Sequence, residues 1–276
     1  MPELDFDPAS LRDWLAVVGL LRLVTATTDA GQMQWRTKHG RFRLFVENTP
    51  DDLANRCEQW VGLHREAWTF GNKKNVDFDA AFWRERARAA TGIEAALWCA
   101  VASDGVWHRD GSKLQASPLE YGHGGGHQHW LASLREFLSI AVKADDFARI
   151  LNSRREETMV GSICRWDPAC ERDHAYRSKA PTKDPMTQDQ TINALAAIGL
   201  ASCPSAPTQL GLVTPLVPNR NTLRWPIWTD PLRLADLEAA LCCDWRWPTM
   251  EARRWLPNKL YCFSRGELCE PEAIAA

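Results

Sequence analysis

Apolar residues recur at helical spacing near the start of the chain. Leu11, Leu15 and Val18 lie three or four positions apart, behind Asp7 and a proline that suit the cap and first turn of a helix. A helix is therefore expected from this pair onward. Beyond it, Phe42, Leu44 and Val46 alternate with Arg41, Arg43 and Phe45 after a Lys-His-Gly turn, which predicts a half-exposed strand.

The same reasoning predicts the other elements. Helices are expected at 53–64, 77–92, 127–141, 145–151, 188–199 and 231–242. In the second of these, Asp77 would cap the start and Gly92 would end the helix. Strands are expected at 96–105, 210–217, 222–228 and 259–266. The two middle strands stand at the separation of a hairpin.

These elements together predict an α+β fold, with mixed helices, short antiparallel strands and a helix-rich C-terminal part. A long polar stretch follows residue 155. We therefore expect an N-terminal α+β domain at 1–155 and a C-terminal domain at 156–276. The change in composition at this boundary is small, so a single domain is the alternative.

Composition narrows the function classes. The chain has 276 residues, a formal net charge of −2 and fourteen tryptophans, whose rings suit an aromatic core or an interface. Free-standing DNA-binding domains are usually basic, so either nucleic acid is not the partner or other subunits supply most of the charge. The nine cysteines include no CxxC pair, the first residues are not signal-like, and apolar runs are short. We expect a cytoplasmic chain with reduced thiols and no membrane contact.

A glycine-rich segment, GHGGGHQH, is the first candidate for chemistry. Its His123, His127 and His129 could bind zinc, but the intervening glycines disfavour the helix that would bring them together. HGGG also occurs in the oxyanion loops of some esterases, yet the companion GxSxG is absent from the sequence. A third interpretation is a connection to a helix N-terminus, where the backbone of Gly124 and Gly125 approaches a phosphate or another chain. A tight turn with satisfied side chains is the structural alternative.

A second candidate metal site is the C-x5-C-x3-H pattern of Cys164, Cys170 and His174. The spacing is loose for zinc and a fourth ligand is not identified. We therefore interpret these as unrelated loop residues and expect neither a metal nor a cofactor. Whether the three bind a metal stays open at this point.

Basic residues gather in three places. A candidate basic patch on the first hairpin consists of Arg36, Lys38, Arg41 and Arg43. The second place is a polar loop and the helix behind it. Its asparagines and lysines could reach base edges, while its arginines could hold phosphates. This candidate DNA-binding loop and the helix behind it contain Asn72, Lys73, Lys74, Asn75, Arg84 and Arg88. A third group contains Arg172, Lys179 and Lys183. An ordinary solvated surface is the alternative for all three.

Two longer motifs give the chain a family likeness. They are PLEYGHGGGH and RWDPACERDHAYRSKAPTKDP. Together with WLAVVGLLRL, FGNKKN, NALAAIGL and RWPIW in this order along the chain, they resemble the small Cascade large-subunit-like proteins of type I-U (I-G) CRISPR systems.

The resemblance implies a non-catalytic subunit of a crRNA-guided surveillance complex, Cascade, that serves antiviral defence. Its implied partners are the other subunits, the guide RNA and double-stranded target DNA. In such complexes base pairing reads the target, while protein reads only the short protospacer-adjacent motif. The resemblance assigns no residue to that task.

Chemistry alone suggests the loop and helix above, with a further contribution to DNA binding from Gly124, Gly125, His127 and Gln128. Two other functions remain open. One is a metal-dependent hydrolase or nuclease that uses the three histidines of the glycine-rich segment. The other is a scaffold subunit without DNA contact.

Overall fold

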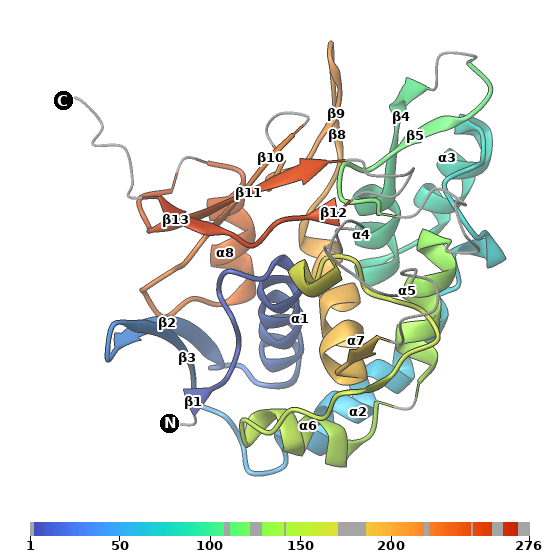
Figure 1. Cartoon of the computed structure of the whole chain (residues 1–276). Coiled ribbons are helices and arrows are strands. Elements are labelled where there is room, and N and C mark those ends of the chain that lie inside the picture. Colours follow the sequence, from blue (N-terminus) through green and yellow to red (C-terminus); the bar gives the residue numbers. More distant parts are fainter. Residues whose placement is uncertain are drawn as a thin grey trace.

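A buried helix organises the fold. The computed structural model describes residues 3–107, 111–121, 129–140, 142–170, 186–217, 221–243, 245–255 and 262–269. Helix α1 (Leu11–Thr27) lies at its centre and packs along helix α7 (Gln190–Gly199), as Figure 1 shows. Residues 11–21 are all buried, which makes α1 a core helix.

The start of α1 differs from the prediction. Ser10 is the N-cap, and its Oγ accepts a hydrogen bond from the N–H of Asp13. Asp7, the predicted cap, instead closes a preceding turn, because its carbonyl accepts from the N–H of Ser10. The carboxylate of Asp7 accepts from the N–H of Ala9.

An antiparallel sheet joins a strand before α1 to the two strands that follow it. Its strands are β1 (Glu3–Leu4), β2 (Gln32–Lys38) and β3 (Arg41–Glu47), in the order β1-β3-β2. The predicted strand at 41–46 is thereby confirmed. Trp35 of β2 pairs with Leu44 of β3, and both side chains are buried against the core. His39 and Gly40 close the hairpin with positive φ, as a two-residue turn requires.

The predicted hairpin between 210–217 and 222–228 is wrong. Strand β9 (Gly211–Val213) pairs with β8 (Ala206–Thr208), and strand β10 (Thr222–Pro226) pairs with β11 (Thr249–Trp255). Gly211, at φ 123°, lets the chain turn tightly between β8 and β9. Strands β12 (Cys262–Phe263) and β13 (Glu267–Cys269) both pair with β11.

The strand predicted at 96–105 is wrong over its first half. Helix α4 (Gly92–Val101) occupies that half, and strand β4 (Ala102–Trp107) follows directly. A short run of apolar residues suits a buried strand or a buried helix equally, and the alanines favour the helix. Gly92 starts α4 rather than ending the helix before it. The preceding helix, α3, is capped by Asp79 instead of Asp77.

The other predicted helices are confirmed within a few residues. The helices outside the centre are α2 (Leu53–Leu63), α3 (Ala80–Ala89), α5 (Trp130–Ser139), α6 (Ala144–Leu151) and α8 (Leu234–Leu241). Short elements complete the described chain: β5 (Leu114–Ala116), β6 (Thr158–Met159), β7 (Thr187–Gln188) and the 3-10 helices η1 (Arg65–Trp68), η2 (Phe70–Asn72), η4 (Pro168–Cys170) and η7 (Leu200–Ser202).

The α+β class with short antiparallel strands is confirmed. Among the described residues after 155, helices α7 and α8 accompany strands β6 to β13, so this part is mixed rather than helix-rich. One hydrophobic core joins residues from Leu4 to Phe263 and continues across the predicted domain boundary at 155. A search of the described helices finds none whose length and apolar character would let it cross a membrane.

Candidate functional site

The FGNKKN segment forms a loop of unusual backbone conformation. Phe70, Gly71 and Asn72 have φ values of 48°, 57° and 60°, so three successive residues lie in the left-handed region. Residues other than glycine rarely adopt this conformation, and strain of this kind collects at functional sites. Phe70 is buried, whereas Asn72 and Lys74 are exposed.

Helix α5 holds this loop in place. The Arg135 guanidinium donates to the carbonyls of Thr69 and Lys73 at 3.0 and 3.3 Å. The N–H of Ala132 donates to the carbonyl of Lys74 at 3.2 Å. These bonds satisfy loop carbonyls that would otherwise face the helix without partners.

Asn75 joins the loop to the start of α5. Its Oδ1 accepts from the N–H of Trp130 at 3.1 Å, and its Nδ2 lies 2.9 Å from Nδ1 of His129. Asn75 therefore satisfies an orphan donor at the helix start, while its amide group fixes the His129 ring. Both ends of this amide are engaged within the protein, so base contact by Asn75 would require these bonds to open.

Helix α3 closes the other side of the loop. The Lys73 ammonium lies over the Phe82 ring, 5.0 Å from its centroid, and the Arg86 guanidinium approaches the same ring at 5.5 Å. Arg84 forms an ion pair with Asp104 of β4, with 2.6 Å between Nε and Oδ2. Arg88 is exposed in the last turn of α3. The loop and α3 thus meet at the Phe82 ring, and we name the loop together with α3 the 72–88 surface.

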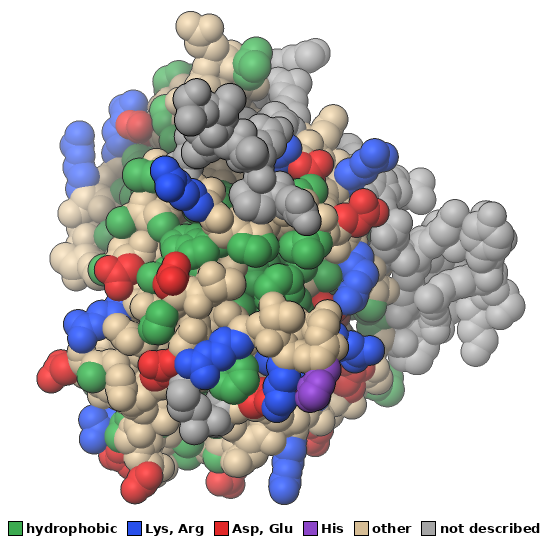
Figure 2. Space-filling model, turned by 90° about the vertical axis from the view of Figure 1, so that its left-hand side faces the viewer, with side chains coloured by type: hydrophobic (Ala, Val, Ile, Leu, Met, Phe, Trp, Pro, Cys, Tyr) green, Lys and Arg blue, Asp and Glu red, His purple; other side chains and the backbone are tan. Residues whose placement is uncertain are grey.

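The basic hairpin lies elsewhere. In Figure 1, β2 and β3 stand on the side of the molecule away from α3. Their cations are paired with carboxylates: Arg36 with Glu47, Lys38 with Glu3, and Arg43 with Asp5 and Glu3. Arg41 is exposed near the turn. The face in Figure 2 mixes acidic and basic side chains, so it offers no continuous basic surface among the described residues.

Several predicted residues lie outside the described part of the chain. They are His123, Gly124, Gly125, His127, Gln128, Arg172, His174, Lys179 and Lys183. Within the described residues, no group of three or more His, Cys, Asp or Glu side chains could hold a metal ion.

Cys164 and Cys170 are buried close to one another. The Cys170 Sγ lies 3.4 Å from the Cys164 carbonyl, and Gln188 bonds both the N–H and the carbonyl of Cys164. Burial raises the pKa of the Cys164 thiol to about 12, and that of Cys170 well above its ordinary value. Metals bind the thiolate. In this environment both side chains pack as small apolar groups.

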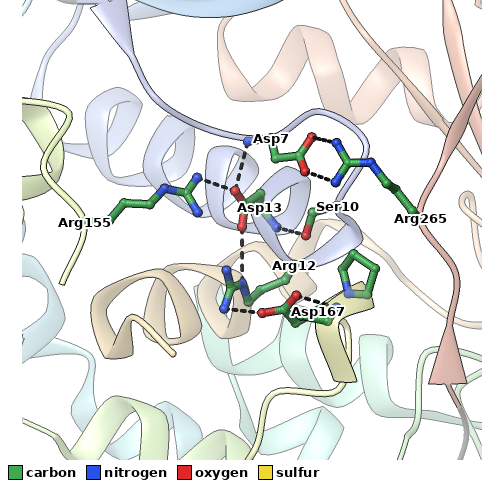
Figure 3. Close-up of a pocket in the computed structure, with 9 residues that line it drawn as sticks. Asp7, Ser10, Arg12, Asp13, Arg155, Asp167 and Arg265 are labelled. Carbon is green, nitrogen blue, oxygen red and sulfur yellow. Dashed lines mark hydrogen bonds and ion pairs between the residues drawn. The ribbon is translucent and has the colours of Figure 1, made fainter. Parts of the chain in front are cut away.

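A buried charge cluster lies at the start of α1. Figure 3 shows Asp13 at its centre, reached by Arg12 and Arg155. The carboxylate of Asp13 is fully buried and also accepts from the N–H of Asp7 at 2.9 Å. The second carboxylate of the cluster belongs to Asp167, whose Oδ2 lies 2.6 Å from the Arg12 guanidinium.

The cluster borders a cavity of about 350 Å³. Arg265 closes one side of this cavity through a bidentate pair with Asp7, at 2.5 and 3.0 Å. Burial alone would lower the pKa of Arg12, but the carboxylates of Asp13 and Asp167 outweigh burial and hold it above its ordinary value. Each aspartate of the lining is paired with an arginine, so the cluster joins distant segments and leaves no excess charge for a ligand. We interpret it as structural.

The two motifs that carry the family likeness meet beside this cluster. Trp166 of the RWDP motif donates its indole N–H to the carbonyl of Leu119 in PLEY, at 2.8 Å. The rings of Trp166 and Tyr121 pack edge to face, with centroids 5.2 Å apart. Burial raises the pKa of Tyr121 well above its ordinary value. The described parts of both motifs therefore build the core.

Comparison with known proteins gives no family for this chain. No family model matches, and neither curated proteins nor solved structures provide a significant match.

Proposed function

We propose that this chain is a non-catalytic subunit of a crRNA-guided CRISPR surveillance complex, Cascade, and that it contacts target DNA at the protospacer-adjacent motif. The 72–88 surface is the contact. The motif order along the sequence supports the complex, and the loop geometry supports the surface.

The observation that carries the proposal is the strained loop. Three left-handed residues place Asn72 and Lys74 at the surface, while Arg135 and Asn75 anchor the loop behind them. Asparagine tolerates positive φ, but a bulky residue such as Phe70 adopts it only at a cost in strain. Such strain persists where the surrounding structure holds it for a purpose, and presentation of side chains to a ligand is one.

The exposed residues suit distinct contacts with DNA. An asparagine can bond adenine N6 and N7, and a lysine can donate to guanine O6 and N7 in the major groove. We assign these contacts to Asn72 and Lys74. Arg88, exposed at the end of α3, suits a phosphate. Lys73 and Asn75, held by Phe82 and α5, keep the loop in position.

The small net charge is compatible with such a role, because guide RNA and other subunits carry most of the binding. The chain would then add a few contacts near the motif to the affinity of the complex for DNA. Phosphate contacts make affinity fall with salt, roughly in proportion to their number.

The test is DNA binding by the complex with and without this chain. The chain is co-expressed with a guide RNA and the other subunits, and affinity for a matched duplex is measured at several salt concentrations. We expect co-purification with guide RNA, tighter binding and a steeper salt dependence when the chain is present.

Failure to co-purify with guide RNA would contradict the proposal. Assembly without any change in DNA affinity would instead indicate a scaffold subunit. Bound zinc together with DNA cleavage that disappears in His123→Ala or His127→Ala would establish the hydrolase alternative.

A further inference from the structure

One tryptophan differs from the others in its environment. Most of the described tryptophans are buried, and several donate their indole N–H to backbone carbonyls: Trp14 to Pro226, Trp83 to Trp98, Trp225 to Pro8 and Trp228 to Met33. Trp107, at the end of β4, is 46% exposed. Among the tryptophans whose side chains the structure describes, it alone belongs to the exposed class.

The backbone around Trp107 is tied to neighbouring elements. Trp107 pairs with Leu114 of β5, which is fully buried and whose N–H donates to the carbonyl of Phe78 at 3.0 Å. On the same strand, Gly105 packs against Pro207 of β8 so closely that a Cβ at 105 would lie 2.6 Å from the Pro207 Cβ. The backbone of β4 is thus held on two sides close to Trp107.

Strand β4, which ends at Trp107, borders the 72–88 surface. Helix α3 packs against β4, and the Arg84–Asp104 pair joins the two elements. The basic residues of this region are Lys73, Lys74, Arg84, Arg86, Arg88 and Lys113. The acidic ones are Asp77, Asp79, Glu85 and Asp104. Arg84 and Asp104 neutralise each other, and the remaining cations still outnumber the remaining carboxylates.

We propose that Trp107 is a stacking platform for an unpaired base of a nucleic-acid strand. The inference rests on the proposed function, because a complex that opens a duplex frees bases beside the place where the duplex is held. Any base can stack on an indole face, and such contacts tolerate sequence variation. The surrounding lysines and arginines supply the attraction to the strand's phosphates.

The test uses the purified full-length chain and fluorescently labelled single-stranded DNA of about 12 nucleotides, a length within the range of known single-strand sites. Affinities are measured for the wild type, Trp107→Ala and Trp107→Phe. Leu210→Ala, which removes another exposed apolar side chain from the adjacent β8–β9 hairpin, is the matched control. Each protein is also tested with an oligonucleotide of the same length that lacks bases.

We expect Trp107→Ala to weaken binding of the normal oligonucleotide by about 5-fold or more, with Trp107→Phe in between and Leu210→Ala unchanged. With the abasic oligonucleotide the Trp107 variants should match the wild type. Equal affinity of wild type and Trp107→Ala, or equal losses on both oligonucleotides, would overturn the inference, as would absence of binding by the wild type. If the Trp107→Ala chain no longer joins the complex but binds the oligonucleotide as tightly as the wild type, the inference is overturned. Trp107 would then contact another subunit. The proposed function fails differently, through loss of guide-RNA co-purification by the wild type.

Discussion

Gly19 of α1 and Gly199 of α7 face each other where the two central helices touch. A Cβ at position 19 would lie 2.0 Å from the carbonyl oxygen of Leu195, and one at position 199 would lie 1.9 Å from that of Leu15. The helices therefore meet backbone to backbone at this point. Close approach explains why glycine stands in the middle of both helices despite its poor helix propensity.

Gly19→Ala should destabilise the protein by about 3 kcal/mol, because the added methyl group collides with rigid backbone and not with a movable side chain. Urea unfolding measures this loss. Gly62→Ala is the control, since a Cβ there meets no atom within 4 Å inside α2. That variant should be neutral or slightly stabilised, by about 0.5–1 kcal/mol at most. Equal effects of both substitutions would contradict the packing account.

The buried carboxylate of Asp13 should matter far more than an exposed one. Asp13→Ala leaves the buried Arg12 and the partly buried Arg155 without their shared partner, so we expect a loss of about 3–5 kcal/mol in the free energy of unfolding. Asp5→Ala removes a carboxylate that is 56% exposed and paired with Arg43, and should cost less than about 1 kcal/mol. Thermal unfolding of the two variants compares them. A small effect at Asp13 would show that the cluster does not hold the segments together.

Local pattern predicted much of the fold, and long-range contacts explain what it missed. Alternation over 41–46 predicted β3 correctly, because one face of that strand is buried and the other is not. The run 96–105 lacks such periodicity, and its helix-to-strand change at Ala102 could not be predicted.

The site shows the same limit. Residue type singled out Asn75 for contact with a base, but its partner His129 lies 54 positions away. Asp13 and Arg155 are 142 positions apart, and nothing in their local sequence signals that they meet. Asp167 lies in the RWDP motif, but only the fold shows that it pairs with Arg12.

Three buried thiols should make stability depend on pH in alkaline solution. Burial raises the pKa of Cys57, Cys164 and Cys203 to about 12, above the ordinary value of 9.0. A pKa that is higher in the folded state gives a stabilising contribution that is complete below pH 9.0 and disappears as the pH rises toward 12. The urea midpoint should therefore fall over this interval, and Cys203→Ala should reduce the slope. A midpoint that stays constant above pH 9.0 would contradict the burial of these thiols.

Asn75 should act on the position of the loop and not on the choice of base. Asn75→Ala removes the acceptor for the Trp130 N–H and the contact to His129, so the loop loses its anchor to α5. We expect a loss of about 1 kcal/mol in stability, typical of a lost helix cap. We also expect weaker DNA binding by the complex for targets with a correct and with an incorrect motif alike. Asn75→Asp keeps the acceptor and should restore most of the stability. A loss confined to the correct motif would assign base contact to Asn75 itself.

We propose that Asn72 and Lys74 read the motif. The direct measurement is the affinity of the assembled complex for paired duplexes that differ only in the flanking motif. Asn72→Ala and Lys74→Ala are compared with Arg88→Ala as the control for phosphate contact. We expect the first two variants to lose about 1–3 kcal/mol of binding free energy for the correct motif and little for the incorrect one. Arg88→Ala should weaken binding to both duplexes and reduce the salt dependence. Unchanged discrimination between the two duplexes in both Asn72→Ala and Lys74→Ala would show that neither residue reads the motif.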